Sequence, residues 1–235
     1  MITVTPPRDV LATDERADRR RPTWPLAGVV AGGASLVGAM AGMPTITDEQ
    51  YLEGVGLVDH LERGGYYVSF VLGMVGVAAL FIAAAGWRRW AAHRAGDDLA
   101  AGTIATALQA TATVNLIGYS MAGAMALYLP GGLDEGTTSH EQLLVNFAYL
   151  DFGTLFGWWG AVLAAGAVAV LAFRRRLLPR WMGVTSAVLM AIPLAVGLLT
   201  ALPGLPGLVM PIWLVAISIG MVLSRSAGAD VGTPR

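Results

Sequence analysis

The distribution of arginine along this 235-residue chain constrains its fold more than any other feature. All fifteen basic residues are arginines, and fourteen of them fall in four clusters separated by long apolar stretches. The clusters are Arg8 with Arg16 and Arg19 to Arg21, Arg88 with Arg89 and Arg94, Arg174 to Arg176 with Arg180, and Arg225 with Arg235. The alternate segments 48–62 and 134–141 carry eight of the sixteen acidic residues and no arginine. By the positive-inside rule, this alternation predicts a multi-pass membrane protein whose two termini are both cytoplasmic.

The composition agrees with a membrane location and excludes several classes of function. With 55% hydrophobic and 13% charged residues, a soluble domain of this size could not cover its core with polar surface. The chain has no cysteine, which excludes disulfides, thiolate metal sites, iron–sulfur clusters and a thiol nucleophile. The net charge of −1 and the sorting of the arginines between loops indicate no nucleic-acid-binding patch.

We expect an all-α integral membrane protein, a bundle of six transmembrane helices with a short amphipathic helix on its outer face. A spanning helix takes roughly 20 apolar residues. The expected spans are about 24–43, 66–86, 99–129, 143–173, 181–202 and 208–223. Residues 1–23 are expected to be a disordered cytoplasmic tail, and 224–235 a second cytoplasmic tail.

Individual residues indicate where a helix begins, where a span meets the membrane interface and where helices pack closely. Thr47 and Gln50 form a candidate capping box at the start of the amphipathic helix, which is expected over 47–63. Trp87 and Trp90 are interpreted as interface anchors of the second span. Four glycines of the first span are spaced for close helix packing, which we interpret as packing inside the bundle rather than self-dimerisation. They are Gly28, Gly32, Gly38 and Gly42.

The third span is the most polar one. It carries two rows of polar side chains, which are Thr103, Thr106, Gln109 and Thr113 on one side and Thr111, Asn115 and Tyr119 on another. Because lipid offers no hydrogen-bond partner, we expect this helix to be surrounded by protein at the centre of the bundle. Gln109 is interpreted as a residue that forms a structural hydrogen bond to a neighbouring helix.

Asp151 is the first candidate for a functional residue, because it is the one acid in or near an apolar span and intramembrane carboxylates are costly. Counting back from Arg174 places it near the outer membrane boundary. It could serve as a general acid or base, or it could be hydrated or paired with Arg63. Both interpretations stay open on the sequence.

Five further residues are candidates for a ligand-binding pocket that opens outward between the second, third and fourth spans. Asn115 and Tyr119 would orient a ligand, Phe147 and Trp158 would line an apolar chamber, and His60 would contribute to a pocket with Asp151. The alternatives are a structural hydrogen bond for Asn115, an aromatic belt for Phe147 and Trp158, and a solvated helix surface for His60. Glu53 and His60 are expected to lie about 10 Å apart on the amphipathic helix, too far for shared metal ligation. The three histidines have no metal- or haem-binding spacing, so no metal or cofactor is predicted.

The segment Leu178-Pro179-Arg180-Trp181-Met182-Gly183 resembles a bacterial family of small six-span membrane proteins with a domain of unknown function, whose members carry an LPRW-L/M motif at this place. The later Pro211-Ile212-Trp213-Leu214-Val215 and the six apolar runs are also similar to that family. The resemblance covers about residues 24–223 and implies a six-span bundle in a bacterial inner membrane. It implies no activity.

The sequence therefore predicts a membrane protein that binds a lipid or isoprenoid-like ligand, with or without catalysis of a cyclase or isomerase type by Asp151. The competing hypothesis is a non-enzymatic accessory subunit of a membrane complex, or a small transporter. Membrane lipids are the expected partners in either case, and a homo-oligomer or a membrane-complex partner stays open.

Overall fold

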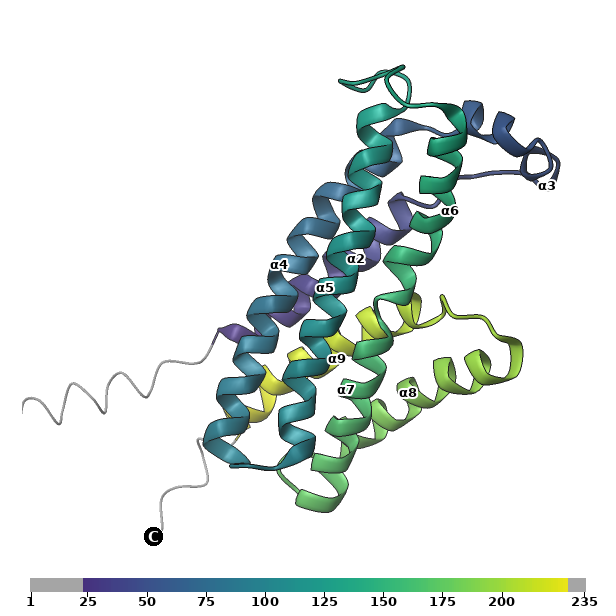
Figure 1. Ribbon diagram of the computed structural model, residues 1–235. Coiled ribbons are helices and arrows are strands. Elements are labelled where there is room, and N and C mark those ends of the chain that lie inside the picture. Colours follow the sequence, from purple (N-terminus) through teal and green to yellow (C-terminus); the bar gives the residue numbers. More distant parts are fainter. Residues whose placement is uncertain (1–22, 228–235) are drawn as a thin grey trace, which may run out of the picture.

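The computed structural model describes residues 23–227, except for the side chains of residues 151–153 and 225–227. The predicted disordered tail 1–23 and the second predicted tail 224–235 fall mainly outside the described residues, although the last helix continues to Ala227 rather than ending at 223. Within the described part of the chain every regular element is helical (Figure 1). The helices are α2 (Trp24–Ala41), α3 (Asp48–Tyr51), the 3₁₀ helix η1 (Gly54–His60), α4 (Arg63–Arg94), α5 (Leu99–Tyr128), α6 (His140–Phe156), α7 (Trp159–Val170), the π-helical turn η2 (Leu171–Arg175), α8 (Arg180–Thr200) and α9 (Pro206–Ala227).

Five helical segments in the described residues are long and apolar enough to cross a membrane, which indicates a multi-pass membrane protein. They are α2, α4, the stretch from α6 through α7 to η2, α8 and α9. The remaining long helix, α5, has 30 residues, but its four threonines with Gln109 and Asn115 interrupt the apolar sequence.

Consecutive long helices run antiparallel and approach closely at small residues. Between α2 and α4, a Cβ added to Gly38 would lie 3.2 Å from the backbone nitrogen of Gly73. Between α2 and α9, a Cβ on Gly28 or Gly32 would overlap atoms of Ser218 or Pro211. The predicted packing of these glycines inside the bundle is confirmed.

Helix α5 lies against α4 on one side and against α6 and α7 on the other. Two hydrogen bonds between α4 and α5 lie far apart along the pair: Arg63 Nε donates to the carbonyl of Ala126 at 2.8 Å, and Arg88 donates to Oε1 of Gln109 at 2.7 Å. The interhelical bond predicted for Gln109 is confirmed. The two helices therefore pack side by side over most of their length.

The prediction that protein surrounds α5 is wrong. The residues Thr103, Thr106, Thr113 and Ser120 are exposed along one side of the helix. Each hydroxyl donates to the carbonyl of the residue four positions earlier. Because this back-bonding satisfies the hydroxyl within its own helix, the row needs no protein partner.

The stretch predicted as one long fourth span is interrupted. Helix α6 ends at Phe156, α7 begins at Trp159, and Gly157 and Trp158 form a turn between them. At this break Gly157 packs against Asn115 of α5, because a Cβ on Gly157 would lie 2.9 Å from Cγ of the Asn115 amide. One turn later Gly160 packs against Ala107 and Thr111 of the same helix. The break therefore lies beside a close approach of α5 to the interrupted helix.

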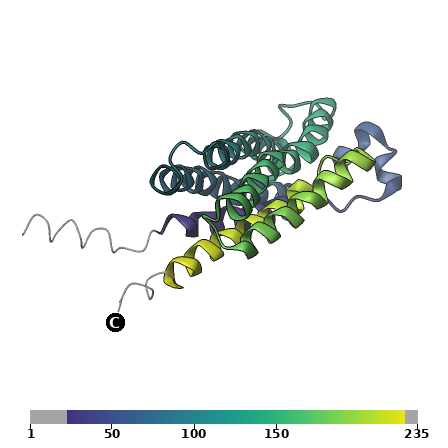
Figure 2. The ribbon, with the colours of Figure 1, turned by 90° about the horizontal axis from the view of Figure 1, so that it is seen from below.

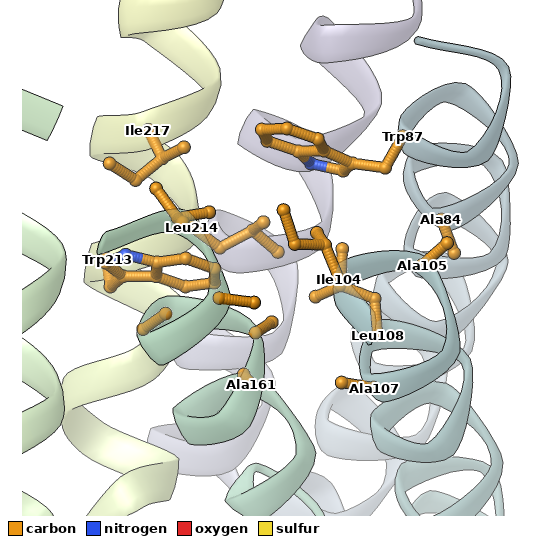
Figure 3. Close-up of a cluster of buried hydrophobic side chains, with 14 of the residues drawn as sticks. Ala84, Trp87, Ile104, Ala105, Ala107, Leu108, Ala161, Trp213, Leu214 and Ile217 are labelled. Atoms are coloured by element: carbon orange, nitrogen blue, oxygen red, sulfur yellow. The ribbon is translucent and has the colours of Figure 1, made fainter. Parts of the chain in front are cut away.

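The main core fills the middle of the bundle with side chains from α4, α5, α7 and α9 (Figure 3). Trp213 is fully buried there, and its indole N–H donates to Oγ of Ser186 at 2.9 Å. Trp87 and Trp90 are only 1% and 7% exposed. Their predicted role as interface anchors is wrong, because the Trp24 ring packs over Gly86 and meets Trp87 edge to face.

Helix α8 is the most peripheral of the long helices. It contacts α7, η2 and α9, and the views from the side and from below show it at the margin of the bundle (Figures 1 and 2). Leu198 and Leu199 near its end are 78% and 85% exposed. Most of its apolar surface is therefore left for lipid or for another protein.

The two ends of the bundle differ in charge. The acidic end carries α3, η1 and the loop between α5 and α6, all at the top of Figure 1. The arginine end carries the end of α4, η2 and the start of α8 at the bottom of the same view. The capping box of Thr47 and Gln50 is present at the acidic end.

The single amphipathic helix expected over 47–63 is replaced by two short helices. Gly54, the first residue of η1, has a φ of +63°, a backbone conformation that ends a regular helix. Leu57, Val58 and Leu61 are buried against α5 and α6, whereas Tyr51 and Val55 are exposed. The segment is anchored by η1 rather than by one continuous apolar face.

Candidate functional site

A polar pocket of about 180 Å³ opens at the acidic end, between the end of α2, η1 and the start of α4. Its lining includes the ionisable side chains of His60 and Glu62, which are both exposed to solvent. The other lining residues are Ala41, Gly42, Met43, Pro44, Thr45, Gly65 and Tyr66. The pocket can therefore hold a small polar or charged group in contact with water.

Local chemistry explains how this pocket is built. The capping box at Thr47 ends the extended link after α2, and the apolar residues of η1 hold the segment against α6. Gly65 sits so close to Ala41 that a Cβ would overlap its carbonyl oxygen, which lets α4 begin beside the end of α2. These contacts place His60 and Glu62 at the same rim.

A hydrogen bond joins His60 and Glu53, with 2.9 Å between Nε2 and Oε2. The expected separation of about 10 Å is wrong, because Gly54, with a φ of +63°, changes the direction of the chain, so that Glu53 and His60 do not lie on one straight α-helix. His140 of α6 lies 3.9 Å from Asp59. The described residues contain no group of three or more side chains that could hold a metal ion.

An apolar cleft adjoins the polar pocket and shares Gly42, Met43 and Pro44 with it. Its other wall comes from α6, through Phe147, Leu150, Thr154 and Leu155. The enclosed space is about 10 Å³, which is room for one water molecule. A larger apolar group would therefore lie along the cleft rather than inside an enclosed chamber.

The sequence candidate Asp151 belongs to α6, in the turn between Phe147 and Thr154. Its side chain lies outside the described residues. Arg63, the partner considered for it, donates to the carbonyl of Ala126 and lies over the Tyr67 ring, 5.9 Å from its centroid.

Asn115, Tyr119 and Trp158 lie in the packed interior, and all three are fully buried. The Tyr119 hydroxyl donates to the carbonyl of Ser35 at 2.9 Å, and its ring covers Gly73. Trp158 belongs to the main core. Among the described residues, neither polar atom of the Asn115 amide has a hydrogen-bond partner.

The six candidates are therefore not gathered around one cavity. Phe147 lines the apolar cleft, His60 lines the polar pocket beside it, and Asn115, Tyr119 and Trp158 tie helices together. Sequence reasoning missed Glu62 and Ser69, which line the pocket and the cleft. The Gly64-Gly65 pair after Glu62 was the available signal, because it marks a close approach of backbone segments.

No family model matches the chain, and no curated protein or solved structure matches it either. The functional argument therefore starts from the pocket and the cleft.

Proposed function

We propose that the chain crosses a bacterial inner membrane six times, with the arginine end in the cytoplasm. Five segments are apolar enough to span, and α5 would be the sixth because it lies antiparallel against α4 over most of its length. Six crossings place Trp24 and the end of α9 on the same side, together with the arginines of α4 and η2. Membership in the six-span family with the LPRW motif is part of this proposal. In support, Pro179 is the N-cap of α8 and the Trp181 ring packs over Gly220 of α9.

Within that topology, the protein binds an amphiphilic lipid or isoprenoid-like molecule at the acidic end. The observation that carries this proposal is the continuity of the polar pocket with the apolar cleft across Gly42, Met43 and Pro44. A polar head group would occupy the pocket near His60 and Glu62, and an apolar chain would follow the cleft past Phe147 and Leu150. The exposed apolar faces of the surrounding helices would let the chain extend into lipid.

An enzymatic version of this proposal assigns Asp151 as the general acid or base. Helical periodicity places position 151 on the same side of α6 as 147 and 154, two positions that line the cleft. In this version Asn115 and Tyr119 orient the substrate indirectly. Both side chains are fully buried, so they would act by holding the helices around the cleft in place. Trp158 would hold the break between α6 and α7.

Native mass spectrometry of protein extracted gently from its own membranes tests the proposal. We expect a stoichiometric lipid or isoprenoid on the wild type and its loss in Glu62→Gln, with Glu49→Gln as a matched control. Glu49 is exposed on α3 and does not line the pocket. Equal ligand content in Glu62→Gln and Glu49→Gln would refute the proposal that the pocket binds the ligand. Unchanged ligand and product in Asp151→Asn would refute only the enzymatic version.

An accessory subunit of a membrane complex is the second candidate. The exposed apolar surface of α8, which reaches 78% at Leu198 and 85% at Leu199, favours it. The same spectra distinguish this candidate, because it predicts a co-purifying protein and an empty pocket. Loss of that protein in a Leu198→Gln and Leu199→Gln double variant would support it.

A further inference from the structure

A second pocket lies at the arginine end, where the start of α5 meets η2. Its volume is about 530 Å³, and it is open to the surroundings of the bundle. It is lined by Asp97, Asp98, Leu99, Ala100, Val170, Arg174 and Arg175. Two acids, two arginines and three apolar residues thus share one surface.

One acid and one arginine of this pocket already satisfy each other. Oδ2 of Asp98 accepts from Nε of Arg175 at 2.7 Å. Oδ1 of the same carboxylate accepts from the backbone N–H groups of Ala100 and Ala101 at 2.9 and 3.3 Å, which caps α5. Asp98 is only 11% exposed. This pair belongs to the framework of the pocket and is not open to a ligand.

The other acid and the other arginine remain accessible. Asp97 and Arg174 are both exposed, and neither makes an ion pair among the described side chains. The pocket therefore offers one accessible negative group, in the turn before α5, and one accessible positive group, in η2. A ligand that carries a single charge would leave one of the two unused.

The apolar part of the lining faces outward. Leu99 is 88% exposed and Val170 is 40% exposed, although they belong to helices that pack into the bundle. At the boundary of a membrane such side chains contact acyl chains, while arginine and aspartate at the same depth contact head groups.

We infer that this pocket binds a zwitterionic phospholipid, phosphatidylethanolamine. Its phosphate accepts hydrogen bonds from the Arg174 guanidinium, its ammonium donates to the Asp97 carboxylate, and its acyl chains lie along Leu99 and Val170. An anionic phosphatidylglycerol would face Asp97 without a counter-charge. The trimethylammonium of phosphatidylcholine has no N–H to donate to that carboxylate. This site lies at the opposite end from the pocket of His60 and Glu62 and does not depend on the function proposed there.

The test uses delipidated full-length protein in detergent, titrated separately with dioleoyl phosphatidylethanolamine, phosphatidylglycerol and phosphatidylcholine. Native mass spectrometry measures the lipid retained per protein. We expect the wild type to prefer phosphatidylethanolamine, and Arg174→Gln or Asp97→Asn to lower its retention by about threefold to fivefold, the size expected for an exposed charge pair. Arg89→Gln is the matched control at the same end, because Arg89 is exposed and does not line the pocket.

A partly unfolded variant would lose lipid binding without any change at the site. A variant that is expected to gain a new lipid preference excludes this explanation. Asp97→Arg replaces the one accessible acid by a second positive group, so we expect it to prefer phosphatidylglycerol over phosphatidylethanolamine. The inference is overturned if wild-type protein prefers phosphatidylglycerol or does not discriminate among the three lipids. It is equally overturned if Arg174→Gln and Asp97→Asn retain as much phosphatidylethanolamine as Arg89→Gln.

Discussion

Replacing Gly73 of α4 by alanine should loosen the junction of α2, α4 and α5. A Cβ at this position would overlap the ring of Tyr119, which is fully buried between the three helices. The ring cannot move aside cheaply, because its hydroxyl donates at 2.9 Å to the carbonyl of Ser35 in α2. Accommodating the methyl group therefore requires α4 to shift or the Tyr119–Ser35 bond to break.

Three terms set the size of the effect on the free energy of unfolding. Forcing a methyl group into a filled core costs about 1–3 kcal/mol. Loss of one interhelical hydrogen bond in a membrane protein costs about 0.6 kcal/mol. In the opposite direction, replacing glycine by alanine inside a helix stabilises the folded state by about 0.5–1 kcal/mol. We expect Gly73→Ala to destabilise the protein by about 0.5–3 kcal/mol.

Unfolding by sodium dodecyl sulfate in mixed micelles, followed by circular dichroism, measures this free energy. Gly33→Ala is the matched control, because Gly33 is also helical but a Cβ there would meet nothing within 4 Å. We expect that control to be more stable than the wild type by about 0.5–1 kcal/mol, the helix-propensity gain alone.

A double-mutant cycle with Tyr119→Ala then identifies the cause. Once the ring is removed, Gly73→Ala should change from destabilising to neutral or stabilising. The reasoning is refuted if Gly73→Ala stabilises the wild type as much as Gly33→Ala does, or if its cost persists without the Tyr119 ring.

Three further predictions concern single contacts. Trp213→Phe removes a buried indole and its 2.9 Å bond to Ser186, so unfolding should become easier by about 2 kcal/mol; an unchanged denaturation midpoint would contradict this. Thr47→Ala removes the hydroxyl that caps α3, and hydrogen exchange of residues 48–51 should accelerate by about fivefold while the global midpoint stays the same. Asn115→Leu replaces a buried amide without partners among the described residues by a side chain of similar shape, and should raise the free energy of unfolding by about 1 kcal/mol; a clear decrease would instead show that the amide is hydrated in the bundle.

Some parts of this structure could be predicted residue by residue. Asp98 caps α5, Thr47 and Ser139 form capping boxes with the residues three positions later, and the glycines of α2 meet α4 and α9. Each feature depends on neighbouring residues in the chain or on the absence of a side chain. Such local features can be read from the sequence because they do not depend on how the rest of the chain packs.

Other parts depended on contacts that a helical wheel cannot show. Thr103, Thr106 and Thr113 appeared to require protein neighbours, yet their hydroxyls bond to their own helix. Trp87 lies at the end of a predicted span, where an interface anchor is expected. It is instead buried in the core, because Gly86 leaves room for the Trp24 ring to pack beside Trp87. His60 and Glu53 meet because Gly54 changes the course of the backbone.

By itself, the sequence determined that this is a helical membrane protein, where its apolar segments lie and which ends of them are basic, because hydropathy and charge act on each segment separately. Only the tertiary structure decided which polar side chains share a pocket. It buried Asn115, Tyr119 and Trp158 and opened a polar pocket at His60 and Glu62. It also brought Asp97, in the turn before α5, and Arg174 of η2 into the lining of one pocket. A site depends on the rotation and depth of each helix relative to its neighbours, and these are set by close packing across the whole bundle.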